Sequence, residues 1–368
     1  MPVLSDGSPF SSCLLPDALT PELALRRGAW VKWIAGASNQ DLVAVEDLAG
    51  IYALAGVHCL DVAADPAVVA AARRGLAWAR EHGAAHPWLM VSLSDGADPH
   101  FRKAWFDPAR CPVDCARPCE RVCPAQAIGV AATGEAGVLG ERCYGCGRCL
   151  PACPPGLIEE RDHHWPADAM APLLRQLQPD AVELHTRLGR GESFALRIRH
   201  LRASGVPLRR LAVSCGLEPA AGEQGASVSA TPAELAAELW QRFGQLRAAG
   251  YRPLWQLDGR PMSGDVGAGT AHAAVNLAVA IAEAAPPGPL QLAGGTNAHT
   301  LVLLQRRGAL ARPVSGVAFG GVARRLLQPL LQRAQERGRS LLADGELWPQ
   351  AMVLARGLVR PWLERRRR

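Results

Sequence analysis

Eight of the eleven cysteines in this 368-residue chain lie within residues 111–153, in two runs that each end in Cys-Pro. The second run is spaced C-x2-C-x2-C-x3-C-P, as in bacterial-type ferredoxins, and consists of Cys143, Cys146, Cys149 and Cys153. The first run has three residues between successive cysteines and consists of Cys111, Cys115, Cys119 and Cys123. Two such runs on one short segment predict a pair of iron–sulfur clusters of the 4Fe-4S type, and therefore one-electron chemistry.

The spacing also predicts which cysteines share a cluster. Three thiolates separated by two residues cap three corners of one cubane, whereas the fourth lies too far along the chain and binds the other cluster. One expected set is Cys143, Cys146, Cys149 and Cys123. The other is Cys111, Cys115, Cys119 and Cys153. The wider spacing of the first run leaves two alternatives for this second set, a four-iron cluster or a 3Fe-4S cluster.

Zinc and disulfide bonds are the alternative uses of these cysteines. Zinc sites usually combine C-x2-C pairs across longer gaps, which fits two proline-closed runs of four poorly. Disulfides need an oxidising compartment, and the N-terminus lacks the basic start and apolar stretch of a signal peptide. We therefore expect iron and a cytoplasmic location. Gly145 and Gly147 suit a loop whose amides point at sulfide, because glycine adopts backbone angles that other residues avoid.

Composition excludes some classes of partner. No stretch of 18 apolar residues is uninterrupted, since the best one, 273–285, contains Asn276 and Glu283, so no integral membrane segment is expected. The net charge is +6, and Arg365–Arg368 supply four of those positive charges. The remaining charges are nearly balanced and interspersed, which gives little support for a nucleic-acid partner.

Short apolar runs alternate with longer helical patterns, which favours a parallel α/β architecture. The expected strands are Val31–Ala35, Cys59–Val62, Trp88–Ser92, Ala181–His185, Leu211–Ser214, Pro253–Leu257, Leu290–Ala293 and Val317–Phe319. The expected helices are Asp41–Leu54, Pro66–Glu81, Thr231–Ala249, Gly267–Ala284, Asn297–Gln305 and Val322–Arg337. Eight strand–helix units of this size predict a (β/α)8 barrel, with a doubly wound open sheet as the alternative.

The cysteine segment then follows the third strand as an insertion, and proline- and glycine-rich joints bracket it. The expected organisation is a leader at 1–28, the first part of the barrel at 29–97, a ferredoxin-like two-cluster module at 98–160, the rest of the barrel at 161–340 and a basic tail at 341–368.

Polar groups and paired glycines end several strands, where barrels collect their functional residues. The last two strands run into Gly294-Gly295 and Gly320-Gly321, each followed by a helix, an arrangement that exposes backbone N–H groups to a phosphate. A flavin mononucleotide (FMN) or another phosphorylated ligand is one interpretation, and simple tight turns are the other. Glu183 and His185 share one side of their strand, which suits an acid–base pair or a structural hydrogen bond.

Several segments together resemble the light-dependent period iron–sulfur proteins of cyanobacteria. They are Trp30–Ser38, Leu60–Pro66, Pro87–Gly96, Phe101–Pro108, the two cysteine runs and Asp258–Gly264. The cysteine pattern alone is common to many ferredoxin modules, whereas its combination with 101–108 is more specific. The likeness covers about residues 29–330.

The resemblance implies a redox-sensing protein that reports photosynthetic electron flow to the circadian clock, adjusts its period and contacts clock-input proteins. It assigns no chemistry to the barrel. Three classes of function remain: a redox sensor or regulator, a flavin-dependent oxidoreductase whose barrel is fed by the two-cluster module, and a simple electron carrier. A simple electron carrier is the least favoured of the three, because it would not need the large barrel. Electron-transfer proteins are the alternative to clock-input proteins as partners.

Overall fold

A closed barrel of eight parallel strands forms the centre of the structure, a computed structural model that describes residues 19–37, 41–130, 136–218, 230–260, 267–311 and 313–365. Around the barrel the strands follow the order β1 (Trp30–Gly36), β2 (Cys59–Ala63), β3 (Trp88–Ser94), β8 (Ala181–His185), β9 (Arg210–Gly216), β10 (Pro253–Asp258), β11 (Leu290–Ala293) and β12 (Val314–Phe319). Strand β1 pairs with both β2 and β12, and this closes the sheet. The predicted barrel is therefore confirmed, and the open-sheet alternative is excluded.

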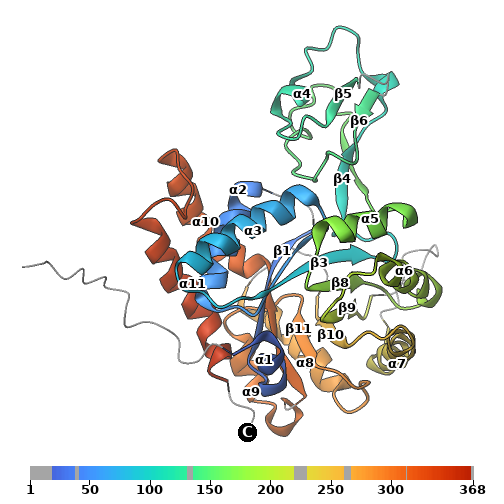
Figure 1. Ribbon diagram of the computed structural model, residues 1–368, viewed down its shortest axis with the longest axis vertical. Coiled ribbons are helices and arrows are strands. Elements are labelled where there is room, and N and C mark those ends of the chain that lie inside the picture. The colour runs from blue at the N-terminus through green and yellow to red at the C-terminus, as the bar shows by residue number, and fades with distance from the viewer. Residues whose placement is uncertain are drawn as a thin grey trace, which may run out of the picture.

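Helices surround the barrel (Figure 1). They are α1 (Pro21–Arg27), α2 (Leu42–Ala55), α3 (Pro66–Glu81), α5 (Ala167–Leu177), α6 (Gly191–Ser204), α7 (Pro232–Ala248), α8 (Ala271–Ile281), α9 (Thr300–Gln305), α10 (Gly321–Glu336) and α11 (Leu347–Leu363). Short 3-10 turns η2 (Ala268–Thr270) and η3 (Gly308–Ala311) precede α8 and β12. Local sequence signals set where these helices begin. For example, Thr231 and Glu234 form a reciprocal capping box at the start of α7.

The two ends of the chain differ from the sequence expectation. Helix α1 lies inside the expected leader and buries Ala24 and Leu25 against the bottom of the barrel interior. Helix α11 lies inside the expected basic tail and packs against α2 and α10. Its buried face includes Ala351, Leu358 and Trp362, so an apolar surface holds it to the barrel in spite of its arginines. Residues 1–18 and 366–368 lie outside the described residues.

The barrel interior changes from apolar to polar along its axis. Trp30, Met90, Ala181 and Leu254 fill the end near α1 in one apolar cluster. Two residues further along the strands the buried side chains are Lys32, Ser92, Glu183 and Gln256. The carboxyl end of the barrel therefore carries the groups that can do chemistry, as is usual in this fold.

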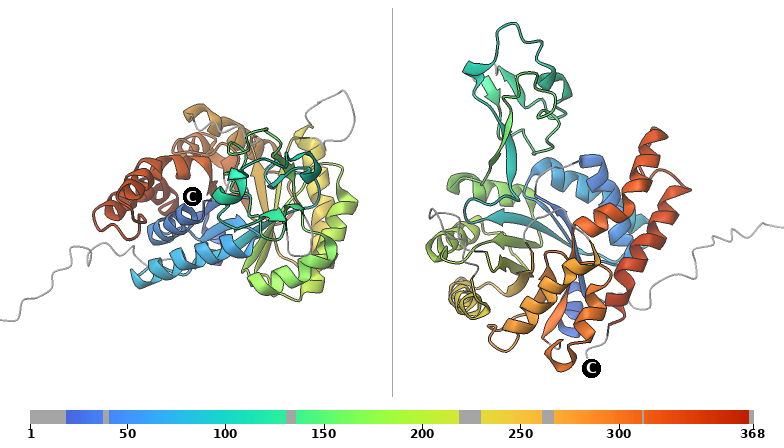
Figure 2. Two further views of the ribbon diagram at one scale, coloured as in Figure 1. Left: turned by 90° about the horizontal axis from the view of Figure 1, so that it is seen from above. Right: turned by 180° about the vertical axis from the view of Figure 1, so that it is seen from behind.

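The cysteine segment is an insertion between β3 and β8, as predicted. Its stem is an antiparallel pair of β4 (Arg102–Trp105) and β7 (Glu159–Asp162). Beyond the stem lie η1 (Pro108–Arg110), α4 (Pro118–Val122) and the strand pair β5 (Ile128–Val130) and β6 (Ala136–Val138). Figures 1 and 2 show this module projecting from one side of the barrel on its stem. Within the described part of the chain, no helix combines the length and apolar character needed to span a bilayer.

Candidate functional site

The eight cysteines of the module gather in two groups, and each group draws on both runs. Cys123, Cys143, Cys146 and Cys149 line one small cavity together with Ile128 and Val138 of the β5–β6 pair. In the other group, Cys111 interacts with Cys115 and Cys153, and Cys119 interacts with Cys153. These are the two sets predicted from the spacing. Their role as ligands remains a prediction.

The two Cys-Pro ends adopt the same local structure. The backbone N–H of Ala127 donates to Sγ of Cys123 at 3.3 Å, and that of Leu157 donates to Sγ of Cys153 at 3.3 Å. Each donor lies four residues after its cysteine, so the two runs end in the same hydrogen-bonded turn although their cysteine spacing differs. N–H···S hydrogen bonds of this kind hold cysteine sulfur in iron–sulfur proteins and tune the reduction potential.

A zinc ion and an iron–sulfur cluster require different distances between the cysteine sulfurs. Four sulfurs around one zinc ion, each about 2.3 Å from it, lie about 4 Å from one another. Among the described residues, the one set of three or more metal-ligand side chains whose donor atoms all lie within 4.8 Å contains no cysteine. A multi-iron cluster separates its cysteines further, because each binds a different iron. All the described cysteines are free thiols, so no disulfide forms in that part of the chain.

Burial raises the pKa of three of these thiols in the absence of metal. Burial and the neighbouring Cys143 and Cys146 raise the pKa of Cys149 to about 12, and burial also raises the pKa values of Cys111 and Cys119. Iron binding has to offset the free energy of deprotonating these thiols, since only the thiolate ligates. Cys119 and Cys149 are buried, whereas the other six cysteines of the two runs are half-buried and can be reached by solvent.

The second cysteine run is attached to the barrel. Tyr144 is buried and packs into the main hydrophobic core. Gly145 and Gly147 have φ angles of 73° and 74°, as expected for a loop that needs glycine. Arg148 of the run reaches Asp41, the residue that caps helix α2, at 3.5 Å. The loop of this run therefore sits directly on the barrel surface.

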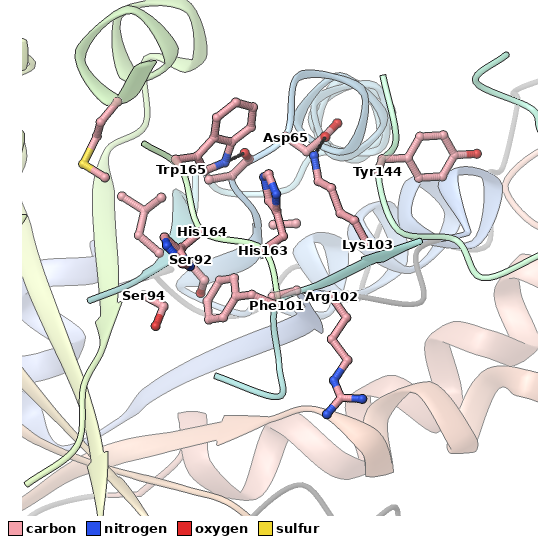
Figure 3. A pocket seen from close by; sticks show the side chains of 15 residues that line it. Asp65, Ser92, Ser94, Phe101, Arg102, Lys103, Tyr144, His163, His164 and Trp165 are labelled. Atoms are coloured by element: carbon pink, nitrogen blue, oxygen red, sulfur yellow. Dashed lines mark hydrogen bonds and ion pairs between the residues drawn. The ribbon is translucent and has the colours of Figure 1, made fainter. Parts of the chain in front are cut away.

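Figure 3 shows the pocket at the root of the stem, where Lys103 lies between the module and the barrel. Its Nζ donates to the carbonyl oxygen of Gly140 at 2.7 Å, lies 3.9 Å from Oδ2 of Asp65 and lies over the ring of Trp165. Trp165 in turn donates from Nε1 to the carbonyl oxygen of Ala64 at 3.0 Å. Strand β4 and the chain after β7 are thus joined to the β2–α3 loop.

A buried network of charges crosses the interior of the barrel. Lys32 is fully buried and pairs with Asp61, whose Oδ2 lies 2.7 Å from Nζ, and with Glu183. Burial alone would lower the pKa of Lys32, but these two carboxylates raise it, so the ammonium stays charged. Burial and Glu183 raise the pKa of Asp61 to about 6. Ser92 donates to Asp61 at 2.7 Å and Gln256 to Glu183 at 2.9 Å.

The network continues to the mouth of the barrel. Oε1 of Glu183 lies 3.1 Å from Nε2 of His185, and the other ring nitrogen of His185 faces Asp98 at 3.6 Å. Asp98 also contacts the ring of His100 at 2.7 Å. Although burial opposes it, hydrogen bonds to Asp98 and Glu183 raise the pKa of His185 to about 10. The predicted Glu183–His185 pair is therefore in direct contact.

A cavity of about 400 Å³ opens above this network. Gly294, Gly295, Gly320 and Gly321 all line it, so the structure brings the predicted glycine pairs to one site. A Cβ at Gly294 would lie 2.7 Å from the carbonyl oxygen of Arg260, and one at Gly295 would lie 2.8 Å from that of Thr270. Close backbone packing alone thus requires glycine at the first pair. Phosphate or FMN binding at these glycines stays a prediction.

Sequence reasoning missed Asp98 and His100 as part of this site. The spacing Asp-Pro-His just after the third strand was an available signal, because loops at this end of a barrel strand face the cavity. Gln256 and Gln291 were also missed. They are linked by a 2.5 Å hydrogen bond inside the barrel, at positions where a strand pattern predicts apolar residues.

Comparison with known proteins gives two family matches. Residues 111–164 match the LdpA Fe-S cluster-binding domain, and residues 173–361 match the light dependent period A C-terminal domain. The curated protein "Light dependent period A" of Synechococcus elongatus is 48% identical over 350 residues, which cover 94% of each chain.

The solved structures that match this chain are much more distant in sequence. The (S)-3-O-geranylgeranylglyceryl phosphate synthase of Thermoplasma acidophilum is 9% identical with a TM-score of 0.39, and covers 91% of this chain and 95% of its own. The tryptophan synthase of Mycobacterium tuberculosis is 14% identical with a TM-score of 0.39, and covers 92% and 93%. Nothing about function follows from similarities at this level.

Proposed function

Because the chain belongs to the light dependent period A family and carries its iron–sulfur cluster-binding domain, we propose that it is a redox-sensing regulator acting on the light-dependent period of a circadian clock. Its clusters report the state of photosynthetic electron transport, and their oxidation state changes how the protein docks on a partner. Clock-input proteins are the proposed partners, with electron-transfer proteins as the alternative, and the proposed location is the cytoplasm.

Two clusters are proposed, one in each group of cysteines. Cys143, Cys146 and Cys149 with Cys123 hold a 4Fe-4S cluster, and Cys111, Cys115 and Cys119 with Cys153 hold the other, as 4Fe-4S or 3Fe-4S. The observation that supports this best is the cavity shared by Cys123 and the three cysteines of the second run. The proposed module spans 98–160 between barrel segments 29–97 and 161–340, and its family match ends slightly later, at residue 164.

The surroundings of the clusters fit a signalling role. Arg121, Arg142 and Arg148 are exposed around the cysteines and carry positive charge on the module surface. A change of one electron in a cluster beside such side chains alters the local electrostatic field. The free energy of docking on a partner would then change by about 1 kcal/mol. Tyr144 and Gly145 connect the same loop to the barrel core and to β4. A structural change at this cluster can therefore be transmitted through these contacts to the root of the stem.

The test compares partner capture in two redox states. The full-length chain, purified without oxygen, is immobilised and exposed to a cell extract after reduction or after mild oxidation. The proposal predicts at least one protein whose capture changes about fivefold between the two states. The Cys149→Ser variant should lose that difference. Equal capture in both states, or steady substrate-dependent electron transfer by the purified chain, would overturn the sensor proposal.

A flavin-dependent oxidoreductase is the second candidate. The cavity of about 400 Å³ supports it, because both glycine pairs and the Glu183–His185 pair face the same space. A flavin spectrum that persists after the clusters are removed would favour this function. Protein with full cluster absorbance and no FMN after reconstitution would exclude it.

A further inference from the structure

Three side chains of metal-ligand type converge at the rim of the barrel cavity. Asp98 and His100 belong to the loop that leaves β3, and His185 is the last residue of β8. One donor atom from each lies within 4.8 Å of the other two, and nowhere else in the described residues do three or more such side chains meet this closely. Donors bound about 2.1 Å from one ion lie about 3 to 4 Å apart, so small rotations suffice to close the set around a metal.

Each member of the set is already oriented. Oδ1 of Asp98 accepts from the backbone N–H of His100 at 2.8 Å, which fixes the loop. Nε2 of His185 faces Oε1 of Glu183 at 3.1 Å, and this leaves Nδ1 pointing toward Asp98. Glu183 is itself held by Lys32 and by Gln256. A histidine whose second nitrogen is held by a carboxylate is the usual arrangement around protein-bound metal ions.

The opposite side of the set is open. Asp98, His100 and His185 all line the barrel cavity, so a bound ion would have its remaining coordination positions directed at that space. Three protein ligands with an open side characterise metal sites that bind a water molecule or a small ligand, in contrast to closed structural sites. Two imidazoles and one carboxylate suit Fe²⁺, Mn²⁺, Co²⁺ or Zn²⁺, whereas Ca²⁺ and Mg²⁺ prefer oxygen donors throughout.

We propose that Asp98, His100 and His185 bind one divalent first-row transition-metal ion at the mouth of the barrel, separately from the clusters of the cysteine module. The ion replaces the proton on the ligating nitrogen of His185, and that proton is released to solvent. The ion would present its open positions to a small oxygen- or nitrogen-donor ligand in the cavity. It would also join the root of the stem to β8, because His100 lies two residues before β4. The competing account is that the same side chains form only a salt-bridged network without metal.

Titration with Mn²⁺ tests the site on the full-length protein with its clusters intact. Adventitious metal is first removed with a mild chelator, and the loss of the free Mn²⁺ signal in electron paramagnetic resonance measures binding. We expect one Mn²⁺ per chain, displaced by Zn²⁺. His100→Ala and Asp98→Asn should each weaken binding at least tenfold, since each removes one of three ligands.

Two controls make the result specific. His86→Ala removes an exposed histidine outside the site and should leave Mn²⁺ affinity unchanged. His100 is partly exposed and on a loop, so its variant should keep the fold, which cluster absorbance and circular dichroism verify. The Cys149→Ser variant should still bind Mn²⁺, which separates this site from the clusters. Failure of the wild type to bind either Mn²⁺ or Zn²⁺, or wild-type affinity in both the Asp98→Asn and His100→Ala variants, would overturn the proposal.

Discussion

Gly145, between the first two cysteines of the second run, lies directly against the carbonyl oxygen of Arg102 on the stem strand β4. A Cβ atom at Gly145 would be 2.5 Å from that oxygen, and φ at this glycine is 73°. The loop of the second cysteine run and the stem are therefore in backbone contact. Because β4 leads back to the loop of Asp98 and His100, this contact links the second cysteine run to a segment that lines the barrel cavity.

Gly145→Ala should disrupt this contact. The added methyl group meets backbone that cannot move aside, and the left-handed conformation adds strain, so the loop should shift and the cluster held by Cys143, Cys146 and Cys149 should be lost or become labile. Iron content and cluster absorbance measure the effect. Gly140→Ala is the matched control, because nothing lies within 4 Å of the added Cβ. Equal cluster content in both variants would show that the contact is unimportant.

Cys123→Ser tests the crossed assignment of ligands. Since Cys123 lines a cavity with the second run, its loss should damage the cluster of Cys143, Cys146 and Cys149 and spare the other. Cys153→Ser should have the reciprocal effect. Electron paramagnetic resonance of the reduced variants distinguishes the two clusters. Loss of the signal from the first run in Cys123→Ser would mean that ligands do not cross.

Lys32→Met should destabilise the barrel by about 3–5 kcal/mol, because it leaves Asp61 and Glu183 buried without their counter-ion. Urea unfolding followed by circular dichroism measures the free energy. Arg74→Met removes an exposed ion pair to Glu46 and should change it by no more than about 1 kcal/mol. Similar small losses in the two variants would indicate that the barrel network contributes little to stability.

His58 should make the fold sensitive to mild acid. Burial lowers its pKa to about 4, and its Nδ1 accepts from the backbone N–H of Val31 at 3.1 Å. The unfolded chain takes up a proton near pH 6.5 and the folded chain only near pH 4, so stability falls as pH drops through this window. The total loss from this group is about 3 kcal/mol. His58→Gln should remove this pH-dependent loss. If the unfolding free energy of the variant fell between pH 7 and pH 4 by as much as that of the wild type, this account would be contradicted.

The strands and the cysteine groups were predictable because their signals are local. Short apolar runs bounded by turns define the eight strands, and the spacing of cysteines such as Cys146 and Cys149 encodes how a loop wraps a cluster. Helix α5 was missed although Met170, Leu173, Leu174 and Leu177 have helical spacing, because Pro172 interrupts the pattern.

The contact of Asp98 with His185 was not predictable in the same way. The two residues are far apart in the sequence, and only closure of the barrel, with β3 beside β8, brings them together. In α6, Arg197 occupies a buried position because its guanidinium donates to the carbonyl oxygen of Trp165 at 2.8 Å. Such long-range polar partners are invisible in a hydrophobic pattern.

Iron and sulfide analysis of the anaerobically purified chain, combined with a redox titration followed by electron paramagnetic resonance, tests the central claim most directly. Two clusters in the crossed cysteine groups predict about eight irons per chain, or about seven if the first run holds a three-iron cluster, and two paramagnetic centres that appear and disappear reversibly. About four irons with a single centre, or zinc in place of iron, would contradict the two-cluster sensor.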